Sequence, residues 1–227
     1  MKTKQLLTNL TNIIDPIVGP DNLQEVRKYI RKAGLRLPSF REVLHLVYTA
    51  HKNYKIKYFR DLVIKFHADR FWTSTGVLYM PKGVYINDNP CRSGNGFLDE
   101  GDLISKLKRS DKNGMYLPYG SYCAGHIDTS ELTQNRFILA LTGKEGSKRL
   151  EFIARENERD WKGEKKSTYL AALTKLPEIF NKKPQARHIT FGCWDTDYGG
   201  LGGAHINTLV ENYDLNEIKA YGIGVEK

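Results

Sequence analysis

Apolar side chains recur at three- and four-residue spacing along the first seventy residues, which predicts short amphipathic helices. The predicted helices cover residues 2–14, 21–34, from 39 onward, and 58–71. Asp15-Pro16 ends the first, and Asp21 is the expected cap of the second. Ser39 and Glu42 have capping-box spacing, in which each side chain bonds a free backbone N–H at the start of the third helix.

The pattern changes after residue 72. Residues 77–80 and 84–87 alternate around Pro81-Lys82-Gly83, which predicts a hairpin in which Gly83 takes a positive φ. A helix over residues 99–109, strands over 115–119 and 220–225, and an amphipathic helix over 167–180 are also expected.

Two later passages have the order strand, glycine-containing loop, helix. The first has a strand at residues 137–141 and a helix to about residue 160; the second has a strand at 188–194 and a helix from residue 204. Strands alternating with helices favour a partly parallel sheet, and the hairpin favours a mixed one. We therefore predict an α+β fold, with α/β as the alternative: a basic N-terminal helical segment (residues 1–72) followed by a mixed β-sheet with flanking helices (73–227).

Composition narrows the class of protein. The chain has 227 residues, 40% of them hydrophobic and 11% aromatic, which is enough for a buried core. No apolar run approaches the roughly 18 residues of a membrane span. Cys91, Cys123 and Cys193 have no metal or redox spacing, and their odd number argues against a disulfide framework. We expect no membrane partner and a cytoplasmic location.

Positive charge is concentrated at one end of the chain. Residues 1–70 carry 14 Lys and Arg against 6 Asp and Glu, whereas residues 71–227 carry 21 against 20. A concentrated cationic surface attracts polyanions, so we predict contact with a nucleic-acid backbone. The alternative is a set of solvated basic faces, some of which offset helix dipoles. The predicted contact residues are Lys28, Arg31, Lys32, Arg36, Lys52, Lys55, Lys57 and Arg60.

A glycine-rich loop is the second candidate site. Four glycines fall in five positions, and a loop between a strand and a helix can direct N–H groups at a phosphate. Residues 143–148 lack the spacing of a phosphate-binding P-loop, and a capped helix start explains them better. The predicted binding residues for a small phosphorylated or acidic ligand are Arg92, Gly199, Gly200, Gly202 and Gly203.

Asp195 and Asp197 follow the strand at residues 188–194. Residues two apart point to one side, so both carboxylates can approach a divalent cation, with His205 as a further base or ligand. The alternative is a turn in which the carboxylates cap local N–H groups.

Three function classes remain. The first is a nucleic-acid-associated protein, with metal-dependent phosphodiester cleavage by Asp195, Asp197 and His205 as its stronger form. The second is an enzyme for a small phosphorylated or acidic ligand at the glycine loop. The third is a non-catalytic adaptor whose basic helices meet an acidic protein.

Overall fold

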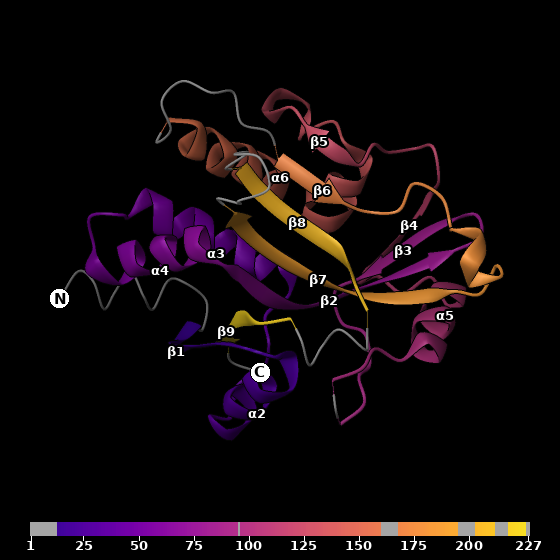
Figure 1. Ribbon diagram of the computed structural model, residues 1–227, viewed down its shortest axis with the longest axis horizontal. Coiled ribbons are helices and arrows are strands. Elements are labelled where there is room, and N and C mark those ends of the chain that lie inside the picture. Colours follow the sequence, from indigo (N-terminus) through magenta and orange to yellow (C-terminus); the bar gives the residue numbers. More distant parts are fainter. Residues whose placement is uncertain (1–12, 95, 160–167, 195–202, 212–217, 226–227) are drawn as a thin grey trace.

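The computed structural model describes residues 13–94, 96–159, 168–194, 203–211 and 218–225 (Figure 1). Helices and strands alternate irregularly along the chain. In order they are β1 (Ile13–Asp21), α2 (Leu23–Lys32), α3 (Phe40–Lys52), α4 (Lys57–Ala68), β2 (Arg70–Met80), β3 (Gly83–Asn87), α5 (Glu100–Lys108), β4 (Gly114–Pro118), β5 (Gly125–Ile127), α6 (Arg136–Arg159), β6 (Thr168–Ala171), β7 (Gln185–Trp194), β8 (Gly203–Val210) and β9 (Ala220–Val225), with 3₁₀ turns at Thr129–Glu131 and Glu178–Phe180.

The strands form one mixed sheet. Its order is β1-β9-β2-β7-β8-β6-β5, with β3 paired to β2 and β4 to β3. The β2–β9 and β6–β8 pairs are parallel, and the other pairs are antiparallel. The predicted α+β fold with a mixed sheet and flanking helices is confirmed.

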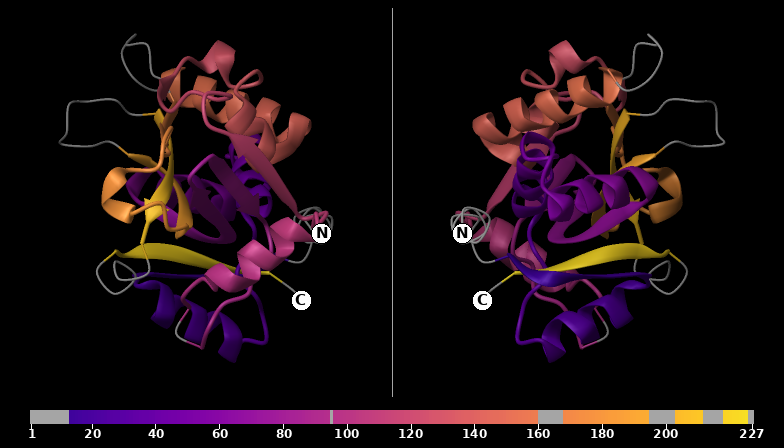
Figure 2. Two further views of the ribbon diagram at one scale, coloured as in Figure 1. Left: turned by 90° about the vertical axis from the view of Figure 1, so that its right-hand side faces the viewer. Right: turned by 90° about the vertical axis from the view of Figure 1, so that its left-hand side faces the viewer.

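The helices α3, α4 and α6 lie on one side of the central strands, as the side views in Figure 2 show. The main core forms there, where the rings of Phe40 and Phe66 lie 5.0 and 4.8 Å from that of Phe191. A second core lies between α2, β9 and Trp72 of β2. Among the described residues, no helix is both long and apolar enough to cross a bilayer.

The first predicted helix is wrong at its C-terminal end, since residues 13–14 belong to β1; residues 2–12 lie outside the described part. The β-branched Ile13, Ile14, Ile17 and Val18 pair with β9, and the register shifts between Ile14 and Ile17. Pro16 sits in that irregularity, a position at which an edge strand accepts proline.

The capping residues of α2 and α3 were predicted with different success. Asn22, not Asp21, caps α2 by accepting a hydrogen bond from the N–H of Glu25 at 3.0 Å. The predicted capping box of Ser39 and Glu42 is confirmed.

The predicted fourth helix ends at Ala68, and β2 begins at Arg70. β2 therefore runs through residue 72, where the sequence predicted a domain boundary.

Two predicted elements near the middle of the chain are wrong. Residues 137–141 are helical, because Asn135 Oδ1 accepts from the N–H groups of Phe137 and Ile138 and so starts α6. A short apolar run suits a buried helix as well as a strand. Residues 167–180 contain the strand β6 and a 3₁₀ turn instead of a helix.

The region after residue 203 is also a strand, not the predicted helix. Ala204, Ile206, Thr208 and Val210 of β8 are buried, and the residues between them are partly exposed, which is a two-residue period. The strands predicted near residues 115–119, 188–194 and 220–225 and the helix near 99–109 are confirmed.

The predicted hairpin is confirmed as β2–β3, with Met80 paired to Gly83 and Pro81-Lys82 as the connection. Gly83 does not have the positive φ expected of it. A glycine is required there because a Cβ would lie 2.2 Å from the carbonyl oxygen of Leu117 on β4.

Candidate anion-binding site

The candidate site forms where β2 changes partners. One edge of β2 contacts β9 at Phe71 and β3 from Gly76 to Met80. Between them, the pairing of β2 with β7 shifts register from Trp72 to Gly76. The backbone of Ser74 bonds outside the sheet, since its N–H donates to Pro38 O at 2.6 Å and its carbonyl accepts from Arg92 Nη2 at 2.7 Å.

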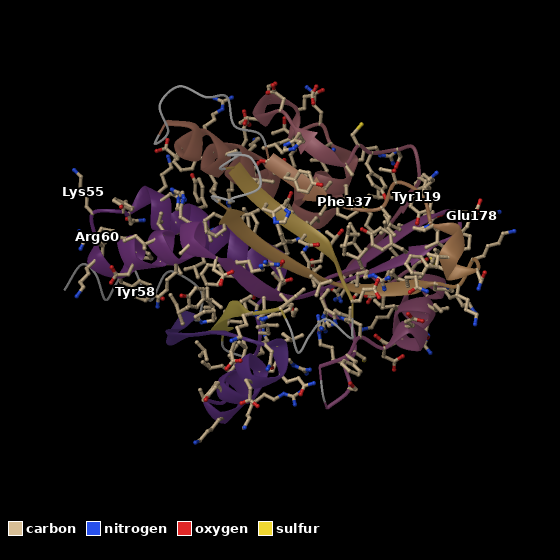
Figure 3. The ribbon with its side chains drawn as sticks, viewed as in Figure 1. Lys55, Tyr58, Arg60, Tyr119, Phe137 and Glu178 are labelled. Carbon is tan, nitrogen blue, oxygen red and sulfur yellow. The ribbon has the colours of Figure 1, made fainter. Side chains whose placement is uncertain are left out.

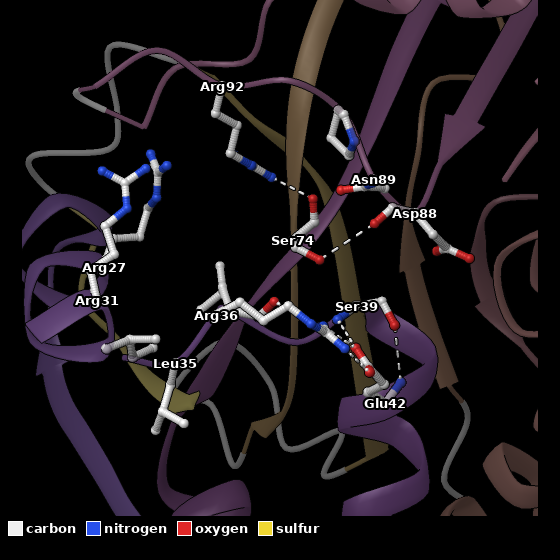
Figure 4. A pocket seen from close by; sticks show the side chains of 13 residues that line it. Arg27, Arg31, Leu35, Arg36, Ser39, Glu42, Ser74, Asp88, Asn89 and Arg92 are labelled. Atoms are coloured by element: carbon white, nitrogen blue, oxygen red, sulfur yellow. Dashed lines mark hydrogen bonds and ion pairs between the residues drawn. The ribbon is translucent and has the colours of Figure 1, made fainter. Parts of the chain in front are cut away.

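A cavity of about 810 Å³ opens at this break in the sheet (Figure 4). Its wall is formed by α2, the connection from α2 to α3, the first turn of α3, Ser74 of β2 and the segment after β3. We call it the arginine pocket, and it is lined by Arg27, Ile30, Arg31, Leu35, Arg36, Leu37, Ser39, Glu42, Ser74, Asp88, Asn89, Pro90 and Arg92.

Three contacts hold the guanidinium of Arg92 in the arginine pocket. Besides Ser74 O, its guanidinium donates to Gly96 O at 3.1 Å and lies 2.6 Å from His188 Nδ1. A guanidinium only donates, so Nδ1 accepts and the imidazole of His188 carries its proton on Nε2. Arg92 Nε is buried and has no hydrogen-bond partner among the described residues.

Both carboxylates of the arginine pocket are already paired. Glu42 accepts two hydrogen bonds from Arg36, at 2.8 and 2.5 Å. Asp88 accepts from Thr75 Oγ1 at 3.0 Å, and its second oxygen lies 3.2 Å from Arg41 Nε. Burial raises the pKa of Asp88, which Arg41 and Thr75 only partly oppose.

The remaining cations of the arginine pocket are Arg27, Arg31 and Arg92, and none has a carboxylate partner among the described residues. Burial and then Arg31 lower the pKa of Arg27 to about 10, and burial and then Arg27 lower that of Arg92 to about 9. Both groups are still charged at neutral pH. Their charge therefore has an electrostatic cost that a bound anion would offset.

The basic residues predicted to contact nucleic acid fall into two groups. Arg31 and Arg36 line the arginine pocket, and Lys28 and Lys32 lie beside them on α2. Lys52, Lys55, Lys57 and Arg60 surround the turn between α3 and α4, where Figure 3 labels Lys55 and Arg60. We call these four residues the turn group.

The turn group has an electrostatic feature that helix stability does not explain. Lys57 and Arg60 lie in the first turn of α4, which has no acidic residue and no side-chain cap. The positive end of the helix dipole disfavours cations at that position. Lys52 differs, because its ammonium lies 3.9 Å from the ring centre of Phe152 and so has a local role.

The second predicted site is only partly described. Asp195, Asp197, Gly199, Gly200 and Gly202 lie outside the described residues. Gly203 begins β8, and His205 lies on β8 away from the residues that line the arginine pocket. Among the described residues, no group of three or more His, Cys, Asp or Glu side chains is placed to hold a metal ion.

Sequence reasoning singled out Arg31, Arg36 and Arg92 but did not bring them together. It missed two residues that line the pocket: Ser74, which lies at the irregularity of β2, and Asp88, which follows β3. The three threonine and serine residues at positions 73–75 interrupt an otherwise apolar strand, and this was the available signal.

The fold and the pocket together define an α+β protein with a cationic, arginine-lined cavity. Comparisons with protein-family models, curated proteins and solved structures find no match to this chain. The chemistry of the arginine pocket is therefore the basis for a function.

Proposed function

We propose that this protein binds phosphate groups in the arginine pocket and that the phosphates belong to a nucleic acid. The observation that carries the proposal is the convergence of Arg27, Arg31 and Arg92 on one cavity whose two carboxylates are already paired. Arginine offers planar pairs of N–H donors that match the oxygens of a phosphate.

The neutral groups of the arginine pocket suit the same ligand. Ser39, Ser74 and Asn89 line it with hydroxyl and amide groups, which commonly contact phosphate and sugar. The formal charge of +9 adds a long-range attraction for a polyanion. The turn group is a second cationic cluster, at the other end of α3.

A small phosphorylated molecule is the second candidate, and the shape of the pocket favours it. Ile30, Leu35, Leu37 and Pro90 supply an apolar wall beside the arginines. A volume of about 810 Å³ lies within the usual range of about 300–1,000 Å³ for small-molecule sites. Metal-dependent cleavage by Asp195, Asp197 and His205 stays a prediction.

The test is fluorescence anisotropy of a labelled single-stranded oligonucleotide at low ionic strength. The double variant Arg27→Ala/Arg31→Ala should lower the affinity at least about 10- to 100-fold, because the loss of even one hydrogen bond to a charged group costs about 1.5–3 kcal/mol. The matched control is Lys28→Ala/Lys32→Ala, which removes two charges from the same helix outside the pocket lining and should change the affinity much less.

Small ligands are tested separately by thermal shift with inorganic phosphate and nucleotides. A ligand at 100 times its dissociation constant should stabilise the protein by about 2.7 kcal/mol, and the stabilisation should disappear in Arg27→Ala/Arg31→Ala. Stabilisation without oligonucleotide binding would select the small-molecule form. If neither class of ligand binds, or if both double variants behave alike, the arginine pocket is not a phosphate site.

A further inference from the structure

A row of side chains crosses five strands on the other side of the sheet from α3 and α6. Direct backbone pairing joins Arg70 to Gly192, Gly192 to His205, His205 to Tyr169, and Tyr169 to His126, on β2, β7, β8, β6 and β5. Directly paired residues point to the same face of a sheet, so the four side chains of this row lie on one face.

The neighbouring row shows which face this is. Phe71, Phe191, Ile206 and Leu170 are each one position away in the same strands, and all four are fully buried in the main core. The row of His126, Tyr169 and His205 therefore faces away from the helices. In Figure 1, no described helix lies in front of β6 and β8, and Tyr169 is 39% exposed.

The three rings follow one another at stacking distance. The ring centres of Tyr169 and His205 are 5.3 Å apart at an angle of 24°, and those of His126 and Tyr169 are 4.9 Å apart at 60°. Burial and then Arg70 lower the pKa of His205 to about 4, so its imidazole is neutral at pH 7. This row is therefore a set of adjacent aromatic rings with the guanidinium of Arg70 beside it.

We infer that His126, Tyr169 and His205 form a stacking site for an unpaired nucleobase. Aromatic side chains on adjacent strands bind bases of single strands by stacking, which needs no particular sequence. The row contains no aliphatic side chain, which makes an apolar peptide a poor match. Arg70 at the end of the row lies 3.7 Å from the carboxylate of Asp69, so the aromatic rings rather than its charge carry the inference.

This inference rests on the nucleic-acid form of the proposed function and adds a preference for single strands. In a duplex each base is already stacked and paired. A base can therefore stack on the row only after it leaves the duplex, which costs unstacking energy. The arginine pocket would hold phosphates and this row a base, on two separate parts of the molecule.

The experiment compares Tyr169→Ala with Tyr116→Ala. Tyr116 is a matched control, because it is 40% exposed and also lies on a short strand, β4, at another end of the sheet. The probes are a single-stranded oligonucleotide and an abasic oligomer of equal length, which has the phosphates without the bases. Tyr169→Ala should lower the affinity for the intact strand about 5- to 150-fold and leave that for the abasic oligomer unchanged.

The control should leave both affinities unchanged, and Tyr169→Phe should keep binding of the intact strand near the wild-type level. If Tyr169→Ala does not fold, Tyr169→Leu replaces it, since leucine fills the position without a ring. Equally weaker binding of both probes by Tyr169→Ala would mean that Tyr169 acts through the fold, and unchanged binding of both would mean that Tyr169 does not stack on a base. Either result overturns this inference but not the proposal of phosphate binding in the arginine pocket. If the wild-type protein binds neither probe, the proposed function fails as well.

Discussion

Glu42 shows how one side chain connects helix stability to the arginine pocket. Its carboxylate accepts hydrogen bonds from two nitrogens of Arg36 and from the backbone N–H of Ser39 at 2.7 Å. Burial alone would raise the pKa of Glu42, but the hydrogen bonds from Arg36 and Ser39 outweigh it and lower the pKa below 4.5. Glu42 therefore keeps Arg36 neutralised while it completes the cap of α3.

Replacing Glu42 with Ala should lower the free energy of unfolding by about 1–2 kcal/mol at pH 7, because it removes half of a capping box and a partly exposed ion pair. A carboxylate whose folded pKa is depressed stabilises the protein above its unfolded pKa and loses that effect as the pH falls through the folded value. The gap between variant and wild type should therefore shrink between pH 5 and pH 3 in urea unfolding.

Glu25→Ala is the control for this measurement. Glu25 occupies the same third position of α2, but its side chain pairs only with exposed Lys28 among the described residues. Its replacement should cost well under 1 kcal/mol. A gap for Glu42→Ala that stays constant down to pH 3 would contradict the assigned role of the Glu42 carboxylate.

At the scale of elements, α6 contains a break at Gly143. This residue has φ 72° and ψ 172°, while the residues on both sides are helical. Thr142 Oγ1 donates to the carbonyl oxygen of Ile138, and Arg41 of α3 donates to the carbonyl oxygens of Ala140 and Leu141. The carbonyl groups that end the first part of α6 therefore have partners.

Gly143→Ala should destabilise the protein by about 1–3 kcal/mol, because that region of φ and ψ is almost restricted to glycine. No atom lies within 4 Å of an added Cβ, so a loss of stability would come from the backbone rather than from a clash. Thermal unfolding measures it, with Gly94→Ala as control, since Gly94 has open space and no positive φ. Equal stability of the two variants would show that α6 can straighten at no cost.

Elements were predictable where the signal lies within a few residues. The box of Ser39 and Glu42 and the hairpin around Pro81-Lys82-Gly83 are such signals, and both the box and the hairpin are confirmed, although Gly83 lies in β3 without a positive φ. The strand β8 was missed because its identity depends on β7 and β6, which flank it and bury alternate residues. The helical residues 137–141 were missed because an apolar run does not specify its partner, which here includes α3.

The arginine pocket was less predictable than the elements around it. Arg27 and Arg92 are 65 positions apart in the chain, and they meet because β2 exchanges β9 for β3 at its bulge. The arginine residues indicated a phosphate ligand, but which of them meet in one pocket depends on the strand order of the sheet. From charge alone, the basic residues were predicted to share one contact surface. In the structure they are divided between the two ends of α3.

The last prediction follows from the distance between the arginine pocket and the turn group on the molecule. The arginine pocket includes Ser39 and Glu42 at the start of α3, and the turn group begins at Lys52 at its end. The 13 residues of α3 span about 20 Å, and an extended single strand spaces its phosphates more widely than the roughly 3.4 Å rise of one strand in a duplex. An oligonucleotide of two nucleotides should therefore reach only one group, whereas one of twelve can reach both.

The double variant Lys55→Ala/Arg60→Ala tests whether the turn group takes part. Each phosphate contact to a single strand contributes about 0.7 to the slope of log affinity against log salt concentration. Loss of two contacts should lower that slope by about 1.4 for the twelve-nucleotide strand and leave it unchanged for the two-nucleotide strand, which the arginine pocket holds. Arg27→Ala/Arg31→Ala should lower the slope for both lengths. Equal slopes for Lys55→Ala/Arg60→Ala and the wild type at both lengths would remove the turn group from the interface and confine binding to the pocket.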